Sequence, residues 1–334
     1  MKQREGYKKT KIGWIPEDWN SVKFGDLFDE RKEVKNEMLP LLSVTSSTGI
    51  VFRDTLAKKD TSASNKSKYK TVHPNDIAYN TMRLWQGVSG LSPYKGIVSP
   101  AYTVLKPKEN VFSPFYKYLM KTDWMISWFL RFSSGICSDT NNCKYRAFKK
   151  IPTILPPLPE QQKIASILTT VDDKLSSIKN QIQQTEQLKK GLMEKLLTEG
   201  IGHTEFKDTK IGKIPASWDV VELGKISTIV RGASPRPKGD PRYYGGNIPR
   251  LMGQDVTRDG KIVFPKIDFL TEEGATKSRF LPKGSLILTC SGTVGIPTIL
   301  GIDACVHDGF IAFAKISYLY SIDFLYYTFA SLQS

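Results

Sequence analysis

Few side chains in this sequence have the types and the spacing that catalysis or metal binding requires. The three histidines, His73, His203 and His307, have no cysteine or carboxylate neighbours at metal-ligand spacing. Cys137 and Cys143 could form half of a metal site, but no second cysteine pair follows them. No G-x-x-x-x-G-K-[ST] loop that would hold nucleotide phosphates is present. We therefore predict no catalytic residue, no metal site and no ATP hydrolysis on this chain.

Two short stretches resemble catalytic motifs. DPRY at 240–243 is similar to the D-P-P-Y loop of amino-methyltransferases, but Arg242 replaces the second proline and no glycine-rich strand–turn–helix accompanies it. Glu17 or Asp18, followed by the ERK at 30–32, could supply the acidic pair and lysine of a metal-dependent nuclease. The segment around residues 17–18 is repeated later in the sequence without either carboxylate, which argues against a catalytic role. Nuclease activity stays an alternative, and metal-dependent cleavage by the isolated chain would support it.

A basic, hydroxyl-rich segment from Ser43 to Lys70 has the composition of a nucleic-acid-binding loop. Long cationic side chains reach phosphates, and short hydroxyls and amides bond the backbone or base edges. The later stretch NTMRLWQG adds an arginine, a tryptophan and a glutamine beside a glycine. The residues predicted to contact DNA are Thr45, Ser46, Ser47, Arg53, Lys66, Lys68, Lys70, Arg83, Trp85 and Gln86. The alternative is a surface loop of generic charge.

A second basic segment begins at VRGASPRPKGDPRYYGG and interleaves arginines with tyrosines. Arginine can pair bidentately with guanine and glutamine with adenine in the major groove. The predicted DNA contacts here are Arg231, Ser234, Arg236, Lys238, Arg242, Tyr243, Tyr244, Gln254 and Asp255. Because the two basic segments differ almost completely in sequence, we expect them to read unlike half-sites of a bipartite, asymmetric target.

These segments belong to a duplicated unit. TKIGWIPEDWNSVKFGDLF at 10–28 returns as TKIGKIPASWDVVELGKIS at 209–227, with Pro16/Pro215 and Trp19/Trp218 kept and no gap. Each copy opens a stretch that mixes short apolar runs with Gly/Pro turns, which is typical of an α+β domain. We predict strands in LPLLSVTS, DIAYNT and IVSPAYTVL, and one helix over Phe115–Phe132. In the second copy, strand-like runs are predicted within YYGGNIPRLMGQDV, GSLILTCSGTVGIPTIL and DACVHDGFIAFAKI, and SIDFLYYTFASL indicates a helix.

A long helix is predicted between the two copies. Pro159 suits the first helical turn, and the apolar residues after it alternate at spacings of four and three, as in a coiled coil. The predicted partner seam consists of Ile164, Leu168, Val171, Leu175, Ile178 and Ile182. The predicted organisation is a first domain at 1–157, a spacer helix at 158–200 and a second domain at 201–334.

Composition favours a polyanionic partner. Lys and Arg outnumber Asp and Glu by 48 to 33, which gives a net charge of +15. No apolar run is long enough to cross a membrane, the basic N-terminus lacks an apolar core after it, and the four cysteines are too scattered for a disulfide framework. We therefore expect a cytoplasmic protein.

The combined pattern resembles the specificity subunit of Type I restriction–modification systems. The resemblance rests on the KIG-x-IP-x-x-W opening at Lys11 and Lys210, on LPPLPEQQKIA at 155–165, and on RGASPRPK…YYGGNIPRLMGQDV and LILTCSGTVG. It implies two target-recognition domains, each a curled mixed sheet with flanking helices, separated by a coiled-coil helix. A second long helix is expected after the second domain, so we interpret the sequence as truncated at its C-terminus.

The resemblance also implies partners. A specificity subunit is non-catalytic and directs two adenine-methyltransferase subunits, with or without two restriction/translocase subunits, to double-stranded DNA. S-adenosylmethionine, ATP and Mg²⁺ would belong to those subunits, and the apolar seam could also mediate self-association. The alternative is a coiled-coil interaction scaffold with a nonspecific basic surface, for which binding indifferent to salt would be the signature.

Overall fold

The computed structural model describes residues 5–34, 36, 38–46, 48–57, 65–135 and 141–333. Ser47 and Cys137, which the sequence analysis names, lie outside the described residues. The chain divides into unit 1, Met1–Ile178, and unit 2, Lys179–Ser334. Each unit has its own hydrophobic core.

Unit 1 is built mainly from short antiparallel strands. Its largest sheet has the order β4-β11-β8-β9, and four further strand pairs surround it. The strands are β1 Tyr7–Thr10, β2 Gly13–Pro16, β3 Asn20–Lys23, β4 Phe28–Glu30, β5 Leu42–Thr45, β6 Gly49–Phe52, β7 Lys70–Val72, β8 Ile77–Asn80, β9 Ser89–Leu91, β10 Gly96–Val98, β11 Tyr102–Pro107 and β12 Pro152–Leu155. The helices are α1 Phe24–Leu27, η1 Arg53–Thr55, η2 Leu84–Gln86, α2 Ser113–Leu119, α3 Asp123–Phe132 and α4 Tyr145–Phe148.

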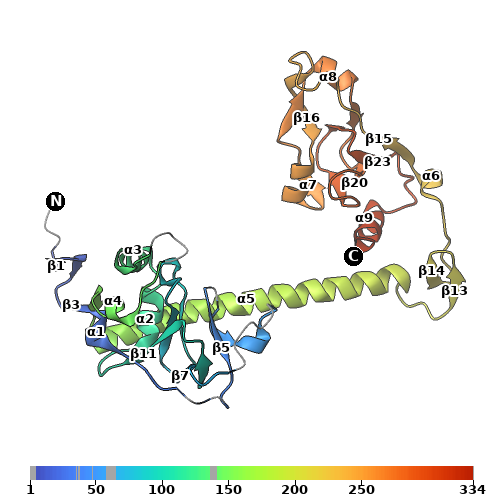
Figure 1. Cartoon of the computed structure of the whole chain (residues 1–334). Helices are drawn as coiled ribbons and strands as arrows, with labels where there is room; N and C mark the ends of the chain where they lie inside the picture. Colours follow the sequence, from blue (N-terminus) through green and yellow to red (C-terminus); the bar gives the residue numbers. More distant parts are fainter. Residues whose placement is uncertain are drawn as a thin grey trace. The chain divides into compact units, whose positions relative to one another are not determined.

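An aromatic cluster forms the core of unit 1. The rings of Phe24 and Phe148 lie 4.6 Å apart, and Phe28 meets Tyr116 edge to face at 5.3 Å. These side chains come from α1, α4 and α2 and from β4, and all are fully buried. Helices α2, α3 and α4 lie close together over this core (Figure 1). Aromatic pairs in such tilted and edge-on geometries add to the stability gained by burying their surface.

The helix α5, Leu158–Thr198, begins at the LPPLPEQ motif. The side chain of Gln161 is fully buried and makes three hydrogen bonds: it accepts from Phe112 N and donates to the carbonyls of Asn110 and Pro156. Glu160 Oε2 accepts a 2.7 Å hydrogen bond from the indole N–H of Trp19. The motif therefore fixes the start of α5 to the repeated opening of unit 1.

Unit 2 contains two mixed sheets, with orders β15-β23-β20-β21-β17 and β18-β16-β22-β19. The pairs β16–β22 and β17–β21 are parallel and the others antiparallel. The strands are β13 Phe206–Thr209, β14 Gly212–Pro215, β15 Thr228–Arg231, β16 Tyr244–Leu251, β17 Ile262–Val263, β18 Asp268–Leu270, β19 Arg279–Leu281, β20 Leu286–Thr289, β21 Pro297–Leu300, β22 Ala304–Val306 and β23 Phe310–Ala314. The helices are α6 Leu223–Ile226, α7 Gly253–Asp259, α8 Glu272–Thr276 and α9 Ile322–Ser331.

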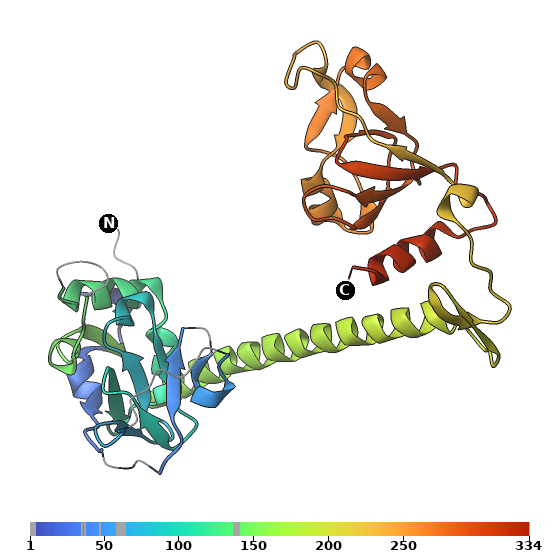
Figure 2. The ribbon, with the colours of Figure 1, turned by 45° about the vertical axis from the view of Figure 1, so that its right-hand side comes forward.

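Two cores organise unit 2. Leu251, Val306 and Phe310 lie in one core, which joins residues of both sheets. Helix α9 packs through Leu325 against the five-stranded sheet, beside Leu286 and Phe313. Figure 2 shows α9 in red, next to the C-terminus. Among the described residues, none of the helices combines the length and the apolar character that crossing a membrane requires.

The predicted α+β class, with a long helix between two sheet-rich parts, is confirmed. The single helix predicted over Phe115–Phe132 is wrong, because it divides into α2 and α3. Thr122 causes the break: its backbone is extended, and its hydroxyl accepts a hydrogen bond from Met125 N as the N-cap of α3. IVSPAYTVL divides into β10 and β11, and the GQDV end of YYGGNIPRLMGQDV lies in α7. Strands are observed in the other predicted stretches, and the C-terminal helix is observed as α9.

Candidate nucleic-acid interface

In unit 1, Lys121 links two of the predicted DNA-contacting loops. Its ammonium donates to the carbonyl of Ser46, at the tip of the β5–β6 hairpin, and to that of Gly87, after η2. Burial, together with the neighbouring Lys117, lowers the pKa of Lys121. The hairpin tip and the η2 loop therefore form one continuous surface, which we call the unit 1 loop surface.

The unit 1 loop surface presents side chains that suit DNA contacts. Arg83 and Gln86 are exposed, and the half-buried Trp85 donates its indole N–H to Met82 O at 3.0 Å, which fixes the loop. Thr45 contacts Thr48 through the two hydroxyl oxygens at 2.7 Å. An arginine and a glutamine on a loop held this way can present donors to phosphates or base edges.

The remaining cations predicted in unit 1 have different surroundings. Lys70 is three-quarters or more buried and paired, because its ammonium donates to Tyr102 O at 2.9 Å and lies 3.3 Å from Glu30. Lys68 is exposed and Lys66 half-buried in the turn that precedes β7. Arg53 is half-buried in η1. Lys70 thus supports the packing of unit 1 and does not extend into solvent.

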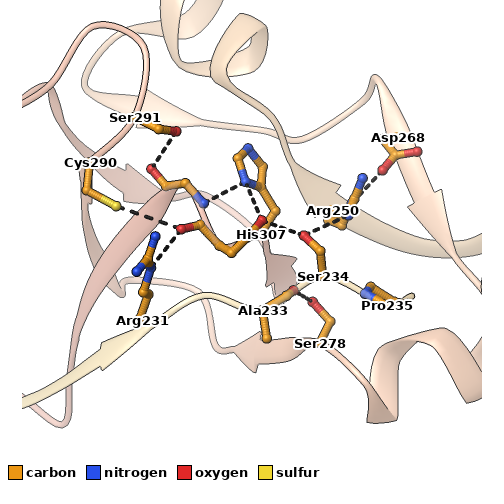
Figure 3. A network of polar contacts seen from close by, with 12 residues as sticks. Arg231, Ala233, Ser234, Pro235, Arg250, Asp268, Ser278, Cys290, Ser291 and His307 are labelled. Atoms are coloured by element: carbon orange, nitrogen blue, oxygen red, sulfur yellow. Dashed lines mark hydrogen bonds and ion pairs between the residues drawn. The ribbon is translucent and has the colours of Figure 1, made fainter. Parts of the chain in front are cut away.

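Unit 2 contains a polar recess of about 230 Å³ between three segments of the chain. The loop after β15, the strand β16 and the turn after β22 contribute to it. It is lined by Ser234, Pro235, Arg236, Lys238, Tyr244, Arg250, Met252, His307 and Asp308. Figure 3 shows Ser234 lying between Arg250 and the turn that contains His307. We call this site the unit 2 recess.

The loop at 232–235 lies close against the end of β22 and the start of β23. Gly232 N–H donates to Phe310 O and Ala233 N–H to Val306 O, both at 2.9 Å. A Cβ on Gly232 would lie 2.0 Å from the carbonyl oxygen of His307, so only glycine fits there. This close approach places Ser234 against the turn at 307–309.

Arg250 forms one wall of the unit 2 recess. It is buried, and its Nε donates to Asp268 while one terminal nitrogen lies 3.4 Å from Ser234 Oγ. Its guanidinium lies 5.0 Å from the centre of the Tyr244 ring, and the Tyr244 hydroxyl donates to Pro235 O at 2.8 Å. A buried guanidinium that is paired and stacked in this way is rigid, and so is the wall that it forms.

The opposite wall contains two titratable groups. Burial and the charge of Arg250 lower the pKa of His307, and its Nδ1 accepts a 2.8 Å hydrogen bond from Gly309 N–H. A hydrogen bond from Ser234, 2.8 Å long, is the main cause that lowers the pKa of Asp308. Arg236 is three-quarters exposed, with one terminal nitrogen 3.5 Å from Asp308 Oδ2. The recess therefore offers exposed cations, Arg236 and Lys238, and one ionised acceptor, Asp308.

Several residues predicted as DNA contacts in unit 2 lie outside the recess. Asp255 is fully buried, caps α7 by accepting from Met252 N and also accepts from Lys266 N, so its role is structural. Tyr243 is also buried. Arg231 donates to Asp308 O beside the recess, and Arg242 is tied to Asp240. Gln254 is exposed on α7.

Asp308 and Met252 were not predicted as site residues, and His307 was considered only as a metal ligand. His307 and Asp308 lie more than fifty positions from the ASPRPK segment, and the pairing of β16 with β22 brings them close to it. The polar stretch VHDGF directly after an apolar run was the available signal, because strand ends often carry binding residues.

No group of three or more His, Cys, Asp or Glu suited to a metal was found in the part of the chain that the structure describes. Glu30, which the nuclease alternative requires, forms the ion pair with Lys70. Of the predicted helix seam, Ile164 packs against the core of unit 1. The other seam residues have exposed fractions from 37% for Leu168 to 53% for Ile182.

Comparison with known families identifies a match to the Type I restriction modification DNA specificity domain over residues 16–187. The chain is 27% identical over 271 residues to the putative type I restriction enzyme MjaX specificity subunit of Methanocaldococcus jannaschii, which covers 75% of this chain and 63% of that subunit. It is 29% identical over 309 residues to the type I restriction enzyme MjaVIII specificity subunit of the same organism, and the match covers 86% of this chain and 67% of that subunit. The chain thus spans about two thirds of the length of these relatives.

Solved structures share the fold. The S subunit of a Type I restriction–modification system from M. genitalium matches with a TM-score of 0.51 at 14% identity, over 100% of this chain and 79% of that one. A chain from a study of complex assembly and conformational transition of the type I R-M system matches with a TM-score of 0.52 at 16% identity. The match covers 96% of this chain and 80% of that one.

Proposed function

Since this chain belongs to the Type I restriction modification DNA specificity family, we propose that it reads a bipartite, asymmetric DNA target. Unit 1 reads one block of base pairs with its loop surface, and unit 2 reads the other with its recess. The chain itself performs no chemistry in this proposal. It selects the sequence on which partner subunits act.

The observation on which this rests is that two units with the same opening present unlike polar surfaces. The unit 1 loop surface offers Arg83 and Gln86 on an exposed loop. The unit 2 recess instead offers Arg236, Lys238 and an ionised Asp308 around a rigid wall. Unlike sets of donors and acceptors match unlike base-pair edges, which is why we expect the two blocks to differ.

The exposed part of the α5 seam supports a second role for the helix. Apolar side chains such as Val171, Leu175 and Ile182 are about half exposed on a helix of 41 residues, which is about 60 Å at 1.5 Å per residue. In our proposal α5 sets the gap between the two blocks and docks the adenine-methyltransferase subunits, with the restriction/translocase subunits joining the complex in the cytoplasm. S-adenosylmethionine, ATP and Mg²⁺ are bound by those partners.

Selection from a randomised duplex pool tests the proposal, with the chain co-expressed with its methyltransferase partner. We expect enrichment of two short, unlike blocks with a fixed gap. Binding to the selected duplex should fall steeply with salt, because cations that neutralise phosphates release counterions. A single enriched block, a palindrome, or binding indifferent to salt would contradict the proposal, and the last result would favour the interaction scaffold.

A further inference from the structure

The unit 2 recess contains an acid where a purely electrostatic DNA site would have none. The carboxylate of Asp308 is 47% exposed, between Arg236 on one side and Ser234 on the other. DNA phosphates repel a carboxylate, so an exposed acid on a DNA-binding surface weakens binding to every sequence unless it meets a donor on the DNA. The donors that duplex DNA offers in its major groove are the amino groups of cytosine and adenine.

The surroundings of Asp308 keep it an acceptor and fix its position. Ser234 donates to Oδ1, while Oδ2 faces Arg236 at the longer distance of 3.5 Å. Its own backbone carbonyl accepts from Arg231 Nε at 3.0 Å, which anchors the turn that contains it. Because an ionised carboxylate can accept about four hydrogen bonds, the exposed Oδ2 retains capacity for a further donor.

Arg236 adds a matching donor beside this acceptor. Its side chain is 74% exposed and, among the residues that the structure describes, makes a long contact to Asp308 alone. Arg250 and Tyr244, by contrast, are held by their own partners. An arginine reads guanine through O6 and N7, and a carboxylate accepts from the amino group of cytosine. Arginine and carboxylate side by side are therefore complementary to the major-groove edges of a G·C pair.

We propose that Asp308 is a specificity-determining residue, which accepts a hydrogen bond from the exocyclic amino group of a base in the major groove of the block that unit 2 reads. The inference deepens the proposed function and rests on it. Cytosine N4 and adenine N6 share this chemistry, and the base enriched at the position distinguishes them.

The test is selection from a randomised duplex pool with the full chain and its methyltransferase partner, comparing the wild type with Asp308→Asn. An asparagine can still accept the Ser234 hydroxyl through Oδ1, but its Nδ2 donates where the carboxylate accepted. We expect the wild type to prefer an amino-bearing base at one position of one block by about tenfold. The variant should lose that preference or exchange it for guanine or thymine, with the other block unchanged.

Asp303→Asn is the matched control, because Asp303 is an exposed acid of unit 2 that lies outside the recess and accepts from Lys283 N. It removes the same charge and should leave both blocks unchanged. The inference is overturned if wild type and Asp308→Asn select the same two blocks. It is also overturned if Asp308→Asn loses one block entirely together with a lowered melting temperature, since Asp308 would then be structural. Failure of the wild type to select two blocks would instead refute the proposed function, and with it this inference.

Discussion

The two copies of the repeated opening fold alike at first and then diverge. Both form a tight hairpin, in which Thr10 Oγ1 donates to Gly13 O and Thr209 Oγ1 donates to Gly212 O. Gly13 and Gly212 have φ angles of 108° and 109°, which lie in the left-handed region that glycine tolerates. The shared KIG motif therefore encodes one local turn twice.

After the hairpin, the environments differ. In unit 1 the indole of Trp19 bonds Glu160, and β3 pairs with β12 from more than 120 positions away. In unit 2 the ring of Trp218 packs edge to face against His203 and Phe324, and residues 219–222 form no strand. Val220 is 50% exposed. The comparison teaches that the opening specifies its hairpin locally, whereas the strand that follows forms only where a distant partner pairs with it.

The largest predicted effect comes from the buried glutamine at the start of α5. Gln161→Leu removes three hydrogen bonds and leaves Phe112 N–H and two carbonyls unsatisfied. We expect unit 1 to lose about 3 kcal/mol of unfolding free energy. The measurement is denaturant unfolding followed by tryptophan fluorescence in a Trp218→Phe background, where every remaining tryptophan lies in unit 1.

Gln162→Leu is the control for that measurement, since Gln162 is the exposed neighbour of Gln161 on the same helix. It should leave the midpoint nearly unchanged. Equal midpoints for the two variants would show that the LPPLPEQ motif does not anchor α5 through Gln161.

The two tryptophans of the repeat should respond differently to the same change. Trp19→Phe deletes a hydrogen bond to a carboxylate and should cost about 2 kcal/mol in unit 1. Trp218→Phe keeps an edge-on aromatic contact and should cost less than about 1 kcal/mol in unit 2. A double-mutant cycle of Trp19→Phe with Glu160→Leu, followed by circular dichroism, should give a coupling of about 1 kcal/mol. Additive effects of the two substitutions would show that the hydrogen bond between Trp19 and Glu160 does not stabilise unit 1.

Two lysines of unit 1, Lys68 and Lys70, were both predicted to contact DNA, but their surroundings differ. Lys68 is exposed, so Lys68→Ala should reduce the slope of log affinity against log salt by about 1. Lys70 contacts Glu30 and Tyr102, so Lys70→Ala should leave that slope unchanged and lower stability by about 1 kcal/mol. Titration of one selected duplex at several salt concentrations checks both, and a reduced slope for Lys70→Ala would contradict the assignment.

The smallest effect concerns pH. A hydrogen bond from the Tyr118 hydroxyl, assisted by Lys117, lowers the pKa of Asp172 on α5 below its ordinary 3.8. A depressed folded-state pKa means that this stabilisation is present above pH 3.8 and is lost as the pH falls through the folded value. Because Asp172 is half exposed, we expect only about 0.5 kcal/mol. Asp172→Asn should remove this part of the loss of unfolding free energy at acid pH. Identical profiles of unfolding free energy against pH for wild type and variant would refute the prediction.

Periodicity and composition predicted much of the fold. The apolar runs that became β8, β11, β20 and β23, and the heptad pattern of α5, are local signals that survive in the structure. The break between α2 and α3 escaped prediction because Thr122 acts as a cap only in an extended backbone, which hydrophobic spacing does not reveal.

The residues of the two candidate sites were harder to predict from the sequence than the fold was. Composition directed attention to the ASPRPK and LWQG segments, which lie at the unit 2 recess and the unit 1 loop surface. It could not separate Asp255, which caps α7, from Asp308, which faces the recess, because both are acids next to apolar runs. Only the pairing of distant strands decides which of them reaches the surface.

The central claim is that each unit reads its own block, and one paired selection tests it most directly. Randomised duplex pools are selected with two variants of the full chain, each with the methyltransferase partner: Arg83→Ala/Gln86→Ala in unit 1 and Arg236→Ala in unit 2. Each variant should relax the preference in one block, the two affected blocks should be different, and the gap should be unchanged. If both variants weaken the same block, or neither alters any preference, the assignment of one block to each unit is wrong.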